Sequence, residues 1–282
     1  MKVLSVIVGC ALITGVQAQT RTADCVAANT PGGYILLSGE TMPKTPDASR
    51  PTGVGAGCRP DTALPATRNS GPGEVRVSTL AASKEAQKAF EKAQRSLGRQ
   101  DPNYAEAARQ LEKALKSSPS FALAWDLLGV VRNRQGEEGR ATEAFENAIR
   151  ADPGYLTPHL RLAAMAVLRN RMEEALRISG VILRLKPGLR EALDYRAVAC
   201  YSLGQRECAA QSARAVLNTG PDSLYPRLHL ILGDILAGQE EYGPAAAEYR
   251  RLIELIPGSP AAIAAGLLIS DWKTQGIIPQ EP

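Results

Sequence analysis

The chain has 282 residues and a formal net charge of +4, from 33 Lys and Arg against 29 Asp and Glu. This mild balance does not favour nucleic acid as a partner. Apolar residues make up 44% of the sequence and charged residues 22%, an ordinary globular composition that excludes wholesale disorder. The chain has only 2 histidines, which nearly excludes a multi-histidine metal site, and we expect neither a metal nor a cofactor.

Residues 1–18 have the pattern of a cleavable secretory signal. Lys2 precedes an apolar run that ends at Val16, and Val16 and Ala18 place small residues at the −3 and −1 positions. The run is too short for a membrane-spanning helix, which needs about 20 apolar residues. A lipoprotein signal ending at Cys10 is an alternative, although few residues precede this cysteine to form an apolar core. The pattern predicts export and no membrane span after cleavage.

Export would place the four remaining cysteines in an oxidising compartment. Cys25 and Cys58 belong to one irregular region, whereas Cys200 and Cys208 are separated by only a few residues. We therefore favour these two local disulfides among the three connectivities that four cysteines allow. Free, buried thiols are the alternative for the second pair.

Residues 19–80 are rich in glycine and proline, which break helices and central strands. The composition predicts an irregular tether or a small disulfide-pinned module. An enzyme with its chemistry in this segment is one hypothesis for the chain. The turn-rich composition and the absence of histidine between residues 19 and 80 disfavour it.

From about Ala81 onward, apolar residues recur at spacings of three and four, as in amphipathic helices. Two residue types then repeat with a nearly constant period. Proline occurs at 119, 153, 187, 221 and 257, and alanine occurs at 107, 141, 175, 209 and 245. The steps are 34 residues, except for a last step of 36 in each series. This period predicts an array of repeated structural units.

With Ala122 as position 1, the unit resembles the tetratricopeptide repeat, a pair of helices in which small residues at positions 8 and 20 let the backbones approach closely. Large residues fill the space within and between pairs, and a proline ends the second helix. The residues that carry the resemblance are Trp125, Gly129, Ala141, Phe145, Pro153, Ala163, Ala175, Pro187, Ala197, Ala209, Pro221, Gly233, Ala245, Tyr249 and Pro257.

The resemblance implies an all-α, right-handed superhelical solenoid, because one helix pair cannot bury its apolar face without a neighbour. The array would span residues 84–259, followed by a C-terminal capping helix over 260–276. The first repeat is degenerate: Arg95 takes the position of the small residue unless an insertion near Asp101 brings Ala93 there. The expected repeats are 84–121, 122–155, 156–189, 190–223 and 226–259.

In this family the concave face is formed mainly by first-helix positions and commonly holds a peptide or a partner's helix. The positions that would line it are Asp126, Val130, Asn133, Arg134, Leu160, Ala164, Val167, Leu168, Asp194, Val198, Tyr201, Leu230 and Asp234. Positions 5 and 9 lack the Lys and Asn with which some family members grip a C-terminal carboxylate. The lining favours an apolar peptide or amphipathic helix with a few basic residues, with Tyr201 as the best single candidate.

His159 and His229 both occupy position 4, a packing position, so we expect them to be spacers within the array. The resemblance and the signal pattern together predict an exported bacterial scaffold that binds proteins or peptides without catalysis. The alternative is a structural subunit or lipoprotein of an envelope assembly or secretion machine. The sequence leaves the oligomeric state open.

Overall fold

The computed structural model describes residues 82–280, which contain eleven α-helices, one short 3-10 helix and no strand. The expected signal peptide, the irregular region and the Cys25–Cys58 pairing lie outside the described residues. The elements are α3 (Lys84–Leu97), α4 (Tyr104–Ser117), α5 (Ala122–Arg134), α6 (Glu138–Ala151), α7 (Leu156–Leu168), α8 (Met172–Leu185), α9 (Arg190–Ser202), α10 (Arg206–Leu217), η1 (Asp222–Leu224), α11 (Pro226–Ala237), α12 (Tyr242–Leu255) and α13 (Pro260–Thr274).

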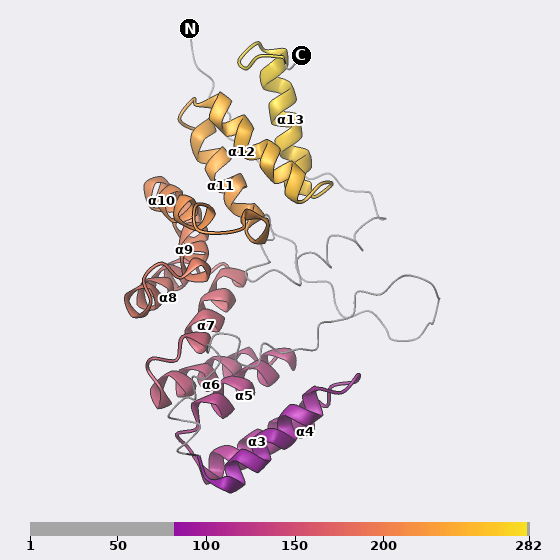
Figure 1. Cartoon of the computed structure of the whole chain (residues 1–282), viewed down its shortest axis with the longest axis vertical. Coiled ribbons are helices and arrows are strands. Elements are labelled where there is room, and N and C mark those ends of the chain that lie inside the picture. The colour runs from indigo at the N-terminus through magenta and orange to yellow at the C-terminus, as the bar shows by residue number, and fades with distance from the viewer. Residues whose placement is uncertain (1–81, 281–282) are drawn as a thin grey trace, which may run out of the picture.

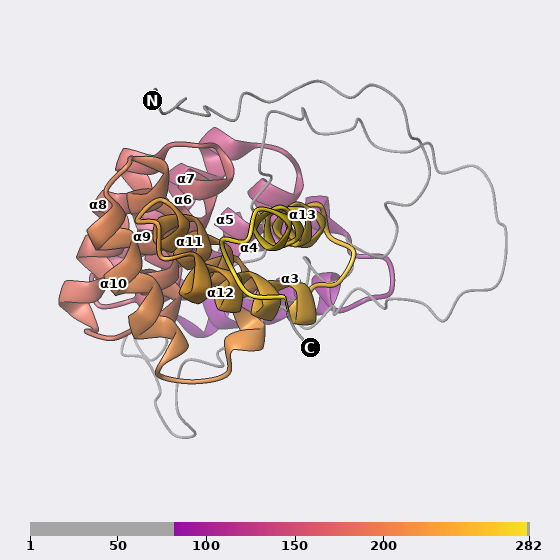
Figure 2. The ribbon, with the colours of Figure 1, turned by 90° about the horizontal axis from the view of Figure 1, so that it is seen from above.

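The helices pack as consecutive antiparallel pairs, from α3–α4 to α11–α12, and α13 packs on the last pair. The pairs stack along the long axis of the molecule, with α3–α4 at one end and α13 at the other (Figure 1). Seen along that axis, α8 and α10 lie to one side of the stack, so the array curves (Figure 2). The predicted all-α solenoid is confirmed.

Small residues set the distance between the two helices of a pair. A Cβ added to Gly129 on α5 would lie 2.5 Å from Cε1 of Phe145, a ring carbon on α6. Gly233 on α11 meets the ring of Tyr249 on α12 in the same way. Real Cβ atoms do not approach a ring so closely, so a larger residue at either position would push the helices apart.

In the second to fifth repeats, the turn between the two helices of a pair contains one residue with positive φ. Gly136 and Gly204 supply it in two repeats, with φ of 78° and 73°. Asn170 and Glu240 hold the equivalent positions at φ 56° and 65°. Asparagine tolerates this left-handed region, but glutamate rarely adopts it, so the backbone at Glu240 is strained.

The first repeat is a helix pair like the others. Ala93 on α3 and Ala107 on α4 are fully buried in one apolar cluster, whereas Arg95 is exposed. The connection between α3 and α4 covers residues 98–103, and the corresponding connection of the second repeat covers only 135–137. The longer connection shifts the register, so that Ala93 rather than Arg95 faces the second helix.

The single irregular step in the period has a local cause. The 3-10 helix η1 lies between Pro221 and α11, where the other repeats pass directly from proline into the next first helix. This extra turn accounts for the step of 36 residues. Within residues 82–280, no helix is both long enough and apolar enough to cross a membrane.

Candidate protein-interaction face

The structure separates the predicted lining residues into three groups by exposure. One group is buried in the array and comprises Asp126, Val130, Val167, Asp194 and Val198. A second group is half-buried and comprises Leu160, Ala164, Tyr201, Leu230 and Asp234. The exposed group is Asn133, Arg134 and Leu168. Some residues of the predicted face therefore pack inside the array, and others are exposed to solvent.

Asp126 ties the second repeat to the third. Its Oδ2 accepts a hydrogen bond of 3.0 Å from the Tyr155 hydroxyl, and its Oδ1 accepts one of 2.9 Å from Nε of Arg161. Both donors belong to residues that follow α6. The carboxylate is buried and both of its oxygens have partners, so it is used by the joint between repeats rather than left for a ligand.

Asp194 makes an equivalent tie between the fourth and fifth repeats. Its Oδ1 accepts a hydrogen bond of 2.8 Å from Nε of Arg227 on α11, and Nη2 of the same guanidinium bonds Oδ2. Asp194 is fully buried. Burial raises the pKa of its carboxyl, while the charge and hydrogen bonds of Arg227 oppose that shift.

Two tyrosine rings lie against arginines at this joint. The Arg227 guanidinium carbon lies 6.0 Å from the centre of the Tyr195 ring, and the guanidinium carbon of Arg190 lies 4.7 Å from the centre of the Tyr225 ring. Burial, together with the neighbouring carboxylates, raises the pKa of Tyr225 to about 12. The Asp194–Arg227 pair is itself largely buried, with 12% of the Arg227 side chain exposed and none of the Asp194 side chain.

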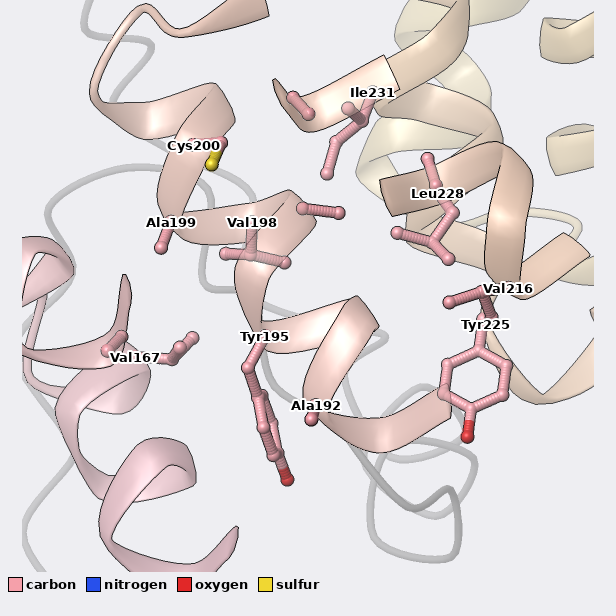
Figure 3. Packing of buried hydrophobic residues seen from close by; sticks show 14 of the residues in the cluster. Val167, Ala192, Tyr195, Val198, Ala199, Cys200, Val216, Tyr225, Leu228 and Ile231 are labelled. Carbon is pink, nitrogen blue, oxygen red and sulfur yellow. The ribbon is translucent and has the colours of Figure 1, made fainter. Parts of the chain in front are cut away.

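The buried valines of the predicted face pack between first helices. Val167 of α7 and Val198 of α9 belong to one apolar cluster, in which Leu228 and Ile231 of α11 also take part (Figure 3). Val130 of α5 packs in a smaller cluster that includes Phe145. Burial of these side chains stabilises the stack, and a ligand could not reach them without separating the repeats.

Tyr201 is half-buried because its hydroxyl is used inside the molecule. It donates a hydrogen bond of 2.5 Å to Oδ2 of Asp234, and the Tyr249 hydroxyl donates one of 2.6 Å to Oδ1 of the same carboxylate. Burial and the hydrogen bond to Asp234 raise the pKa of both phenols. Tyr201 is only partly exposed, and both its hydroxyl and Asp234 already have partners.

The histidines and the described cysteines lie in packing positions. His159 and His229 are buried, and Nδ1 of His229 lies 2.7 Å from Oε2 of Glu248. Burial lowers the pKa of His159. Cys200 on α9 and Cys208 on α10 have Cα atoms 5.8 Å apart, a separation that a disulfide spans.

A tetratricopeptide-repeat family model matches residues 99–155 and 196–260, which include the Gly129–Phe145 and Gly233–Tyr249 contacts. The two matched segments are tetratricopeptide repeats, and the helix pairs from α3 to α12 form the solenoid typical of that family. The fold of this family presents binding surfaces to other proteins, so the array belongs to a class of protein-interaction modules.

Solved structures of tetratricopeptide-repeat proteins share the fold. PilF of Pseudomonas aeruginosa is 21% identical, with a match covering 69% of this chain and 89% of that chain at a TM-score of 0.56. PilW, a widely conserved type IV pilus biogenesis factor, is 18% identical over 69% and 93% of the two chains, at 0.52. A tetratricopeptide repeat protein of Parabacteroides merdae is 18% identical over 69% and 78%, at 0.57. None of the curated proteins matches the sequence.

The ties between tetratricopeptide repeats were missed by sequence reasoning. Position 5 carries an acid in two repeats, and an arginine follows each acid about one period later: Arg161 after Asp126, and Arg227 after Asp194. That spacing was the available signal, because it brings opposite charges to facing first helices of successive repeats. The acids were instead assigned to the ligand face.

Proposed function

We propose that the array is a non-catalytic scaffold that holds a segment of a partner protein against the exposed ends of its first helices. The observation that carries this proposal is Leu168. Its side chain is 49% exposed at the last residue of α7, although its neighbour Val167 is buried. Asn133 and Arg134 are exposed at the equivalent end of α5. These three side chains stand on the predicted face with no role in the packing.

The chemistry of the partner follows from the residues that remain. The acidic side chains that favoured a basic partner already have partners inside the molecule. Asp126 and Asp194 pair with arginines, and Asp234 accepts two phenolic hydrogen bonds. The remaining surface combines Leu168 with the half-buried Leu160 and the polar ends of α5. An amphipathic helix or extended peptide with apolar anchors fits this surface. A rigid, preformed face limits the entropy lost on binding.

We place this activity in the bacterial envelope. The signal pattern of residues 1–18 supports export, and PilW, which shares the fold, is a type IV pilus biogenesis factor. A disulfide between Cys200 and Cys208 would be stable in that compartment and would join α9 to α10. A structural subunit or lipoprotein of an envelope machine is the second candidate, favoured by the same resemblance.

Two leucines offer a matched test of the binding face. Leu168 and Leu185 are exposed to the same degree, 49% and 48%, and each ends a helix. Leu168 belongs to a first helix, whereas Leu185 ends the second helix of the same repeat. A photo-reactive amino acid at position 168 should crosslink to an envelope protein, and the same probe at 185 should not.

The captured protein, purified, should then bind the wild-type chain and its Leu185→Arg variant equally. It should bind Leu168→Arg at least about tenfold more weakly, since a charge replaces an apolar anchor. Equal binding by both variants would contradict the proposed face. Intact-mass analysis decides between the two candidates, because a mature chain beginning at Gln19 without lipid has no anchor, whereas a lipid on Cys10 would favour the lipoprotein.

A further inference from the structure

The C-terminal helix α13 has the place of a first helix in a sixth repeat. It begins at Pro260, 34 residues after Pro226, which begins α11. One face of α13 packs on the last helix pair through Ala262, Ala265, Ile269 and Trp272. No second helix follows within the described residues, which continue only to 280.

The opposite face of α13 is apolar and exposed. Ile263, Leu267 and Leu268 are 57%, 68% and 41% exposed. No charged residue lies between Pro260 and Ser270. At 100° per residue, positions 260, 263, 264, 267, 268 and 271 all lie within one side of the helix, away from the buried residues.

The helix at the other end of the array shows what a solvent-facing terminus requires. The outer face of α3 exposes Lys84, Glu85, Lys88, Glu91, Lys92 and Arg95. Terminal elements of repeat arrays need such polar faces to remain soluble. Because α13 lacks one, its outer face has the character of an interface.

A second helix of the usual kind cannot close on this face. The residue of α13 that corresponds to Gly233 of α11 is Leu267, one period of 34 later. In α5 and α11 a glycine at this position lets an aromatic ring of the second helix approach the backbone. Leu267 prevents that approach, so the face suits a helix packed at the ordinary interaxial distance of about 8–10 Å.

We propose that this face binds α13 of a second copy of the chain, with the two helices antiparallel about a two-fold axis. Placing Ile263 opposite Leu268 of the second copy also places Ala264 opposite Leu267, a small residue against a large one. The same register brings Asp271 to Pro260 of the second copy, the first residue of its helix. The positive end of the helix dipole attracts this carboxylate, which gives the pairing its charge complementarity.

The test is the mass of the full chain in solution, measured by sedimentation velocity over a range of concentrations. The wild-type chain should pass from its monomer mass of 30.0 kDa to twice that value as concentration rises. Leu267→Glu should remain monomeric, with self-association at least about a hundredfold weaker, because two charges would be buried in the pair. Because Leu267 is exposed in the monomer, this variant should melt at the wild-type temperature at concentrations where the wild-type chain is itself monomeric.

Leu185→Glu is the matched control, since it places the same charge at an exposed leucine of α8 and should associate as the wild type does. Asp271→Asn tests the direction of the helices. In the antiparallel pair it should weaken association about two- to fivefold, through loss of the dipole contact. Stronger association of Asp271→Asn would indicate parallel helices with apposed carboxylates and would overturn the arrangement. A wild-type chain that stays monomeric, or an unaffected Leu267→Glu variant, would overturn the proposal.

Discussion

Two joints between repeats use the same pair of residue types and differ in their exposure to water. At the second–third joint, Arg161 keeps about a quarter of its side chain exposed, and Asp126 also accepts a bond from Tyr155. At the fourth–fifth joint, Asp194 is fully buried, and among residues 82–280 its hydrogen bonds come from the Arg227 guanidinium. The first carboxylate has a second donor and nearby solvent, whereas the second depends on one guanidinium.

This difference indicates that position 5 has no fixed energetic role in the array. Taking a carboxylate out of water costs several kcal/mol in practice, and only close pairing offsets that cost. At the fourth–fifth joint, pairing with Arg227 offsets this cost, and the burial of both side chains leaves little room for water to replace the guanidinium. We therefore expect equivalent substitutions at the two joints to differ in effect.

The largest effect is expected from Arg227→Met. This change removes the guanidinium that pairs with the buried Asp194 carboxylate, so the free energy of unfolding should fall by about 3–5 kcal/mol at neutral pH. Urea unfolding followed by circular dichroism measures it. The equivalent change at the second–third joint, Arg161→Met, should lower the free energy of unfolding by only about 1–2 kcal/mol. The Tyr155 hydroxyl still donates a hydrogen bond to Asp126, and solvent can reach the space that Arg161 leaves.

The pH dependence of the stability of Arg227→Met shows whether the loss comes from the unpaired Asp194 carboxylate or from lost packing. Burial raises the pKa of Asp194, and without Arg227 nothing opposes that shift. The folded variant then binds a proton that the unfolded chain has released, so its stability should rise as the pH falls from 8 to 5. Asp194→Asn combined with Arg227→Met should recover much of the loss at pH 8. Equal losses at both joints, independent of pH, would contradict the comparison.

A smaller effect is expected from overpacking inside the repeat that supplies Asp126. Gly129→Leu forces the Phe145 ring away from α5 and should lower the free energy of unfolding by about 1–3 kcal/mol. Gly139→Leu is the control, because a Cβ there would meet nothing within 4 Å. If Gly129→Leu melts at the wild-type temperature, the helix contact does not set the spacing of this repeat.

The architecture could be predicted because its determinants are periodic. Small residues such as Gly129 and Ala141 recur with the step of the repeat, and each helix pair repeats one local solution. The extra turn η1 could be recognised only as an irregular step of 36, since its three residues carry no distinctive motif.

The use of the first-helix face could not be predicted in the same way. Position 5 of the repeat carries an acid in two repeats and leucine in two others. Whether such an acid faces solvent or packs against the next repeat depends on a hydrogen-bond donor about 34 residues later in the chain. Arg161 and Arg227 supply that donor, but an arginine on a helix surface is more often solvated. Side-chain partnership across repeats depends on the curvature of the stack, which a linear pattern does not encode.

The smallest effect is expected at a partly exposed ion pair, Asp222–Arg251, which joins the same two repeats as the buried pair Asp194–Arg227. Asp222 of η1 accepts hydrogen bonds of 2.6 and 3.0 Å from Arg251 of α12, and these bonds lower the pKa of its carboxyl to about 2. The unfolded chain therefore takes up a proton first as the pH falls below about 4, and the contribution of this pair is lost between there and pH 2.

Since both side chains of this pair are partly exposed, the contribution is at most about 1 kcal/mol. Asp222→Asn should thus be slightly less stable than wild type at pH 6, and most of this difference should be gone at pH 2, as measured by urea midpoints. Asp101→Asn, an exposed carboxylate in the α3–α4 connection, should show no difference at either pH. A stability difference as large at pH 2 as at pH 6 would mean that Asp222 supports the fourth–fifth joint by its shape, and not by its charge interaction with Arg251.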